Sequence, residues 1–162
     1  MKRFPNCLCR REAAEWVIDM DLFDRIMELS RCGYFCSQIL AILLLETLGE
    51  ENKGFVKAMG GLNGGIGFSG GTCGCMTGGA CIISYLTGKS EDTQRDHPEH
   101  RSAMGEFTQW FTEEMLVDCG SIECSDITGG NPARRVEICP QIIADSFMKC
   151  MEILNEKGLI QC

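Results

Sequence analysis

The sequence lacks a hydrophobic run long enough to cross a bilayer. Its longest apolar stretch, residues 39–45, is far shorter than the roughly 20 residues that span the hydrocarbon core. Lys2 and Arg3 are not followed by an apolar segment, which argues against a secretory signal. We therefore expect a cytoplasmic protein that does not enter the membrane.

Basic residues and histidines are also scarce. Lysine and arginine number 15 against 23 acidic residues, so the formal charge is -8. This charge disfavours binding to nucleic acid or to an anionic membrane.

Only two histidines are present, and the sequence has no C-x-x-C-H motif and no C-x-x-C pair. These absences exclude covalent haem attachment, a thioredoxin motif and a hydrolytic triad.

Cysteine, in contrast, is abundant, with 12 residues in a chain of 162. Disulfides do not persist in a reducing cytosol, and a chain of this length can build its own hydrophobic core. Thiols that gather in such a fold are therefore expected to be metal ligands or redox groups.

Apolar residues recur at helical spacing along most of the chain, and no segment shows sustained alternation typical of strands. The pattern predicts an all-α fold, a single-domain bundle of about four main helices over residues 1–162, with a glycine-rich cofactor loop. A single helical turn is expected near Ser125. The main helices are predicted at Glu12–Arg31, Tyr34–Leu48, Glu99–Val117 and Pro140–Leu154, with shorter apolar segments at Phe55–Met59 and Ala80–Leu86.

About half of residues 60–79 are glycine, so no regular helix or strand is expected there. Cys73 and Cys75 lie in this stretch, where the backbone can approach a cofactor closely and its N–H groups can point at anionic sulfur. The alternative is that the glycines only allow tight helix packing. A G-x-G-x-x-G match at residues 65–70 has no strand before it, which argues against dinucleotide binding.

Two further cysteines, Cys32 and Cys36, are spaced i, i+4 and can face the bundle interior together. Either could bind metal, or both could be small buried hydrophobic residues. Cys81 is expected to pack in the core. The remaining thiols near the chain ends, Cys7, Cys9 and Cys162, could form a second site or be spare thiols.

The last candidates lie in the C-terminal half. Cys119 and Cys124 flank a loop, and Cys139 precedes Pro140 at the expected start of the last helix. Such positions favour thiolates because backbone amides there are free. Cys150 lies eleven residues beyond Cys139, on the order of 16 Å along a helix, so the two cannot bind one small cluster.

The order of Cys36, the run Gly74-Cys75-Met76-Thr77-Gly78-Gly79, then Cys124 and Cys139 resembles the redox-active family named C_GCAxxG_C_C for its own motif. Met76 stands where the motif has alanine, and either Cys73 or Cys75 could be the motif cysteine. The match extends over about residues 34–154. The chain is also similar to the non-haem, iron–sulfur domain of split-Soret cytochromes.

The resemblance implies an iron–sulfur redox protein, with 2Fe–2S favoured over 4Fe–4S, and family members occur mainly in anaerobes. It implies that Cys36, Cys73 or Cys75, Cys124 and Cys139 are the ligands. An electron-transfer protein or oxidoreductase subunit with a redox partner protein is favoured over a stand-alone enzyme, and a homodimer is left open. The alternatives are a metal-free thiol–disulfide protein and a structural zinc protein.

Overall fold

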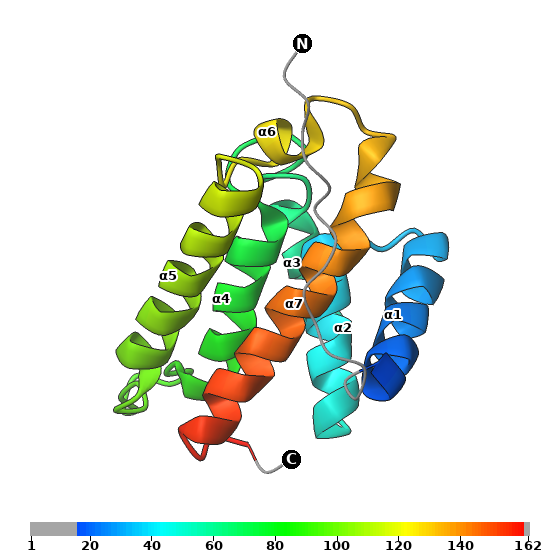
Figure 1. Cartoon of the computed structure of the whole chain (residues 1–162). Coiled ribbons are helices and arrows are strands. Elements are labelled where there is room, and N and C mark those ends of the chain that lie inside the picture. The colour runs from blue at the N-terminus through cyan, green and yellow to red at the C-terminus, as the bar shows by residue number, and fades with distance from the viewer. Residues whose placement is uncertain (1–15, 161–162) are drawn as a thin grey trace.

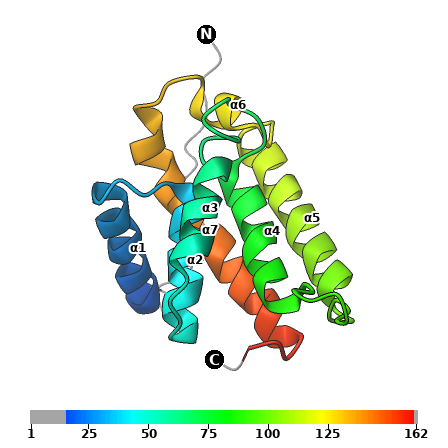
Figure 2. The same ribbon diagram turned by 180° about the vertical axis from the view of Figure 1, so that it is seen from behind.

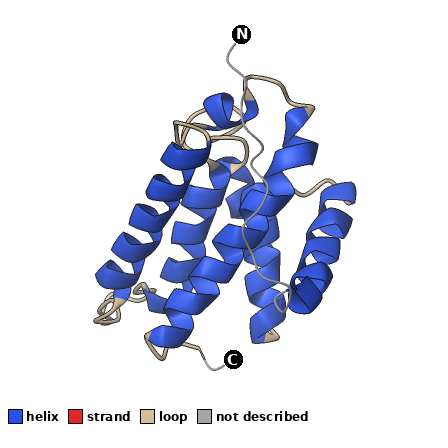
Figure 3. Cartoon of the chain, in the orientation of Figure 1, coloured by secondary structure: helices blue, strands red, loops and turns tan. Residues whose placement is uncertain are grey.

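The computed structural model describes residues 16–160 (Figure 1). Helices dominate this part of the chain, and it contains no strand, only one isolated bridge between Thr72 and Glu123 (Figure 3). The helices are α1 (Trp16–Arg31), α2 (Cys36–Leu48), α3 (Lys53–Met59), the 3₁₀-helix η1 (Gly60–Leu62), α4 (Gly74–Thr87), α5 (His100–Asp118), α6 (Cys124–Thr128) and α7 (Arg134–Glu156). The predicted all-α fold is confirmed.

Helix α4 lies at the centre of the bundle and packs against α2, α5 and α7, while α7 also packs against α1 (Figures 1 and 2). The core is built from fully buried aliphatic and aromatic side chains of five helices. Among the largest are Ile26, Ile39, Leu40, Leu44, Ile82, Ile83, Phe107, Phe111, Ile153 and Leu154. Helices α2, α4, α6 and α7 all begin at the same end of the molecule (Figure 1).

Several predicted elements are found close to their expected bounds. Helix α2 is apolar on most of its faces, which suits its position between neighbours, and it ends at Gly49 in the left-handed conformation. Helices α1 and α5 also follow the predicted periodicity within the described residues. The single turn expected near Ser125 is helix α6.

Two predicted boundaries are wrong. The glycine-rich stretch was expected to lack helix up to Gly79, yet α4 begins at Gly74 and includes Gly78 and Gly79. With α4 the described chain has five helices of 13 residues or more, one more than predicted. Glycine disfavours a helix locally, but here it permits close helix packing. A Cβ on Gly78 would lie 3.0 Å from the Cα of Ser37, so only glycine lets α4 approach α2 this closely.

The last helix was predicted to begin at Pro140, but α7 begins at Arg134 and Pro140 lies buried inside it. Proline cannot donate the next helical hydrogen bond, which is why it normally marks a helix start. Burial of Pro140 against the bundle maintains the helix through this position. Cys139 is therefore inside a helix and not at its first turn, which corrects the sequence expectation.

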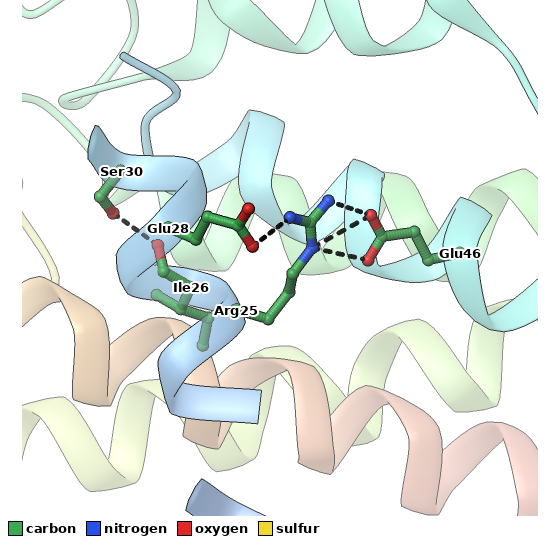
Figure 4. Close-up of polar contacts among 5 residues, drawn as sticks. All are labelled: Arg25, Ile26, Glu28, Ser30 and Glu46. Atoms are coloured by element: carbon green, nitrogen blue, oxygen red, sulfur yellow. Dashed lines mark hydrogen bonds and ion pairs between the residues drawn. The ribbon is translucent and has the colours of Figure 1, made fainter. Parts of the chain in front are cut away.

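An ion pair joins the first two helices on the surface. The Nε of Arg25 in α1 lies 3.2 Å from both carboxylate oxygens of Glu46 in α2, and its Nη1 lies 2.6 Å from Glu28 (Figure 4). Both partners are partly exposed, so the pair orients α1 more than it stabilises the fold.

Within residues 16–160, every helix is too short or too polar to cross a membrane.

Candidate functional site

Cysteines from four chain segments meet at the end of the bundle where α2, α4, α6 and α7 begin. Cys36 is the first residue of α2, Cys73 and Cys75 flank the first residue of α4, Cys124 begins α6, and Cys139 lies in α7. The thiols are near enough to perturb one another electrostatically. We call these residues the cysteine group. It contains every cysteine that the sequence analysis assigned to a cofactor site.

Cys75 lies at the centre of the group, fully buried, and its side chain forms hydrogen bonds with both Cys36 and Cys73. These hydrogen bonds are the main reason that the pKa of Cys75 is raised, and burial adds to the effect. The hydrogen bond from Cys75 lowers the pKa of Cys36 to about 6 and also lowers the pKa of Cys73. Cys75 thus retains its proton beside two thiols that ionise readily.

Backbone amides add further donors to the same two sulfur atoms. The amides of Gly64 and Ser37 donate to Cys36, which lowers its pKa further. The amides of Cys75 and Met76 donate to Cys73 at the start of α4. Helices α2 and α4 both begin at the group, so the positive ends of their dipoles lie beside its sulfur atoms. The site therefore stabilises negative charge on sulfur.

Gly74 permits the approach of Cys36 to α4. A Cβ at this position would lie 2.5 Å from the Cys36 sulfur and 2.9 Å from the carbonyl oxygen of Leu62. Any larger residue would displace the thiol or the loop that precedes α4. The first glycine of the motif is therefore required by the position of another cysteine.

Two hydrogen-bonded loops bring Cys73 and Cys124 together. The amide of Cys73 donates to the carbonyl of Ile122 at 2.9 Å, and the amide of Cys124 donates to the carbonyl of Gly71 at 2.7 Å. The Thr72–Glu123 bridge lies between these contacts. The glycine-rich loop and the segment before α6 thus form one backbone unit that carries both thiols.

Sequence analysis missed a buried amide network beside Cys36. Asn63 is 3% exposed, accepts a hydrogen bond from Ser37 Oγ at 2.6 Å and donates to Gln38 Oε1 at 2.9 Å. The Cys36 sulfur lies 4.0 Å from the same Asn63 oxygen. A lone amide residue within the glycine-rich, apolar stretch was the signal that could have indicated it.

Arg135 was also missed, because the last helix was expected to begin at Pro140. Its guanidinium carbon lies 5.3 Å from the centroid of the Phe68 ring. Burial raises the pKa of Cys124 and raises that of Cys139 to about 12, and the positive charge of Arg135 opposes both shifts. The spacing of Arg135 and Cys139, i and i+4 on a helix, was the available signal.

The other cysteines do not join the group. Cys150 is fully buried, with its sulfur 3.8 Å from the carbonyl oxygen of Gly79, and burial alone raises its pKa. Cys81 is partly buried, as is Cys119, while Cys32 is exposed at the end of α1. Cys7, Cys9 and Cys162 lie outside the described residues.

Within the group, the Cys75 thiol is in hydrogen-bond contact with Cys36 and Cys73, whereas Cys124 and Cys139 act on the other thiols through charge. In residues 16–160, no three histidine, cysteine or acidic side chains surround a single point at which one metal ion would be bound. His100 lies with Nδ1 2.7 Å from Thr87 Oγ1, away from the cysteine group.

Comparison with known proteins gives one match. The model of the family described as "Putative redox-active protein (C_GCAxxG_C_C)" matches residues 34–153, which include the whole cysteine group. No curated protein and no solved structure matches the chain, so the similarity to split-Soret cytochromes stays a prediction.

Proposed function

Because the chain belongs to the C_GCAxxG_C_C family of redox-active proteins, we propose that it is an electron carrier whose cysteine group binds an iron–sulfur cluster. The observation that carries this proposal is the convergence of cysteines from four chain segments on one end of the bundle. Electrons would pass to or from a partner oxidoreductase.

The donor set suits such a cluster. Iron–sulfur clusters are bound by cysteine thiolates and are stabilised by amide hydrogen bonds to sulfur. The group supplies buried thiols, and backbone amides of Gly64, Ser37 and Met76 donate to two of them. Zinc would use the same donors but would carry no electron, so the redox character of the family favours iron.

We assign the ligands to Cys36, Cys73, Cys124 and Cys139. Cys73 is preferred to Cys75 because two amides donate to its sulfur, whereas Cys75 is fully buried and retains its proton. Cys75 would then orient the Cys36 and Cys73 thiolates through its hydrogen bonds. The bound cluster would supply one-electron chemistry, and the polypeptide would exclude water and neutralise its charge.

A second candidate rests on the contact of Cys75 with Cys36 and Cys73. In this alternative the ionised Cys36 and a neighbouring thiol form a disulfide without metal, and their two electrons pass to a disulfide of a partner protein, which becomes a dithiol. The proton of the neighbouring thiol passes to one partner sulfur, and the other partner sulfur leaves as a thiolate that takes its proton from water. The low pKa of Cys36, about 6, supports this chemistry at neutral pH.

Anaerobic purification followed by iron, acid-labile sulfide and zinc analysis, with a visible spectrum, tests the proposal. Iron with sulfide and a visible band that bleaches on reduction is the expected result. Replacement of each cysteine of the group by serine should reduce iron content for Cys36, Cys73, Cys124 and Cys139 more than for Cys75. A colourless protein without iron, whose thiol count falls with oxidant, would favour the disulfide candidate, and zinc alone would contradict both.

A further inference from the structure

Arg135 places a permanent positive charge beside the cysteine group. It lies one turn before Cys139 on α7, and its side chain also forms a hydrogen bond with Cys124. Arginine remains protonated in proteins, so this charge does not depend on pH in the ordinary range. In a partly buried site such a charge acts on nearby sulfur with little screening by solvent.

The ring of Phe68 fixes the position of this charge. The guanidinium lies over the ring face, an arrangement that binds a cation electrostatically. Phe68 is itself held by an edge contact with Phe35 at 4.9 Å, directly before Cys36. It adopts a φ of 62°, which is uncommon for an aromatic residue. The loop thus accepts a cost in backbone energy while presenting the ring to Arg135.

The Nε–H of Arg135 is buried and has no hydrogen-bond partner in the described structure. A buried donor without an acceptor is costly, and such groups are rare in folded proteins. Negative charge on the neighbouring Cys124 and Cys139 sulfur atoms would compensate electrostatically for this incompletely satisfied guanidinium. The arrangement is therefore better suited to an anionic cysteine group than to a neutral one.

We propose that Arg135, clamped by Phe68, is an electrostatic positioning residue that stabilises negative charge on the cysteine group and thereby raises its reduction potential. The statement about potential rests on the redox function proposed above. Reduction adds negative charge to an iron–sulfur cluster, and it converts a disulfide to thiols that can ionise. Arg135 favours the reduced state in both cases, and its loss lowers the potential.

A pair of alkylating reagents measures the charge effect without any cofactor. Iodoacetate is anionic and iodoacetamide is neutral, and both react with the same thiolate. The ratio of their rates therefore cancels the ionised fraction and reports the local field. In metal-free, reduced protein, Arg135→Gln should lower the iodoacetate-to-iodoacetamide ratio at Cys124 and Cys139, the two thiols on which its charge acts, by roughly threefold or more at low salt. Arg135→Lys should retain most of the ratio.

Arg134→Gln is the matched control, since it removes an equal charge from the preceding residue of α7. It should leave the ratio nearly unchanged. Phe68→Leu keeps the guanidinium but releases it from the ring, so the ratio should fall toward the Arg135→Gln value. An unchanged ratio in Arg135→Gln, or an equal fall in Arg134→Gln, would overturn the proposal. If Arg135→Gln does not fold, the ratio measured in Phe68→Leu tests the proposal in its place.

Potentiometric titration of the loaded protein then tests the effect on potential. Arg135→Gln should have a lower midpoint potential than the wild type, and Arg134→Gln should not. Metal analysis of the wild type judges the iron–sulfur function by itself, whereas the reagent ratio judges Arg135 with no metal present. Failure of one can therefore be distinguished from failure of the other.

Discussion

The Cα of Gly79 lies directly against the ring of Phe107, so that a Cβ on Gly79 would be 2.1 Å from the ring's Cζ. Phe107 is fully buried between α4 and α5. The last glycine of the family motif therefore sets the distance between two helices, whereas Gly74, the first, makes room for a cysteine. Packing and site formation are both encoded in one short motif.

Gly79→Ala should destabilise the protein, because the methyl group can be accommodated only if α5 moves or the Phe107 ring leaves its position. Overpacking of this kind typically costs about 1–3 kcal/mol. Chemical denaturation followed by circular dichroism measures the loss. Gly105→Ala on α5 is the control, since no atom lies within 4 Å of its added Cβ. Its higher helix propensity should raise stability by about 0.5–1 kcal/mol, and equal losses in both variants would contradict the packing argument.

Gly74→Ala should impair the cysteine group more than the fold. The added methyl would displace the Cys36 sulfur, which lies 2.5 Å from the position it would occupy. We expect bound iron per protein to fall severalfold, measured after anaerobic purification. Gly61→Ala, where the added Cβ meets no atom within 4 Å, should retain the wild-type iron content. Full iron content in Gly74→Ala would show that the position of Cys36 is not critical.

The reactivity of Cys36 should depend on pH in metal-free, reduced protein. Its pKa of about 6 predicts half-maximal alkylation by iodoacetamide near that pH. Cys75→Ala removes the principal hydrogen bond to Cys36, so the midpoint should rise toward the ordinary value of 9.0. Cys75→Ser keeps a donor and should remain close to the wild type. Peptide mass spectrometry resolves the site, and a midpoint unaffected by Cys75→Ala would contradict the role of Cys75.

The same shift predicts how stability varies with pH. A thiol whose pKa is lower in the folded state stabilises the fold fully above its unfolded pKa, and the contribution is lost as pH falls through the folded value. The contribution of Cys36 should therefore decline between pH 9.0 and about 6. Denaturant titrations of the metal-free wild type and of Cys36→Ala should converge as the pH is lowered across this range. If the difference in unfolding free energy between the two proteins did not change with pH, ionisation of Cys36 would not contribute to stability.

Ile66→Gly should stabilise the protein, although a substitution by glycine usually lowers the stability of a folded protein. Ile66 has a φ of 59° and is 57% exposed, so its side chain loses little burial on removal. Removal of the steric strain of the left-handed backbone should stabilise the fold by about 1–2 kcal/mol. The greater conformational entropy of glycine in the unfolded state should offset about 0.5–1 kcal/mol of this gain. We expect a gain of up to about 1 kcal/mol by denaturant titration. Val117→Gly, at 84% exposure in α5, should instead lower stability, and equal losses would disprove the strain at Ile66.

Sequence reasoning succeeded where local pattern and tertiary structure agree. The apolar periodicity of α2 and α5 follows from their burial. The structure also brings the cysteines chosen from the motif to one end of the bundle, while their role as ligands stays a prediction. It failed where packing overrides local preference. Gly78 and Gly79 are poor helix formers but are needed for close contact, and Pro140 lies within α7 because the bundle covers it.

The role of Arg135 could not be predicted for a different reason. Its placement depends on Phe68, whose ring position depends in turn on an unusual left-handed backbone. No periodicity in the sequence reports such a conformation for an aromatic residue. Residues that act through a strained loop become visible only when the loop itself is seen.

The wide separation of Cys36 and Cys139 along the chain determines when the group can form. Cys139 lies on α7, the last helix, which packs against α1, α2, α4 and α5. During translation α7 leaves the ribosome after the helices that carry the other thiols. The nascent chain therefore exposes its earlier thiols before their partner exists, and cofactor delivery or oxidation at the completed group must follow the emergence of α7.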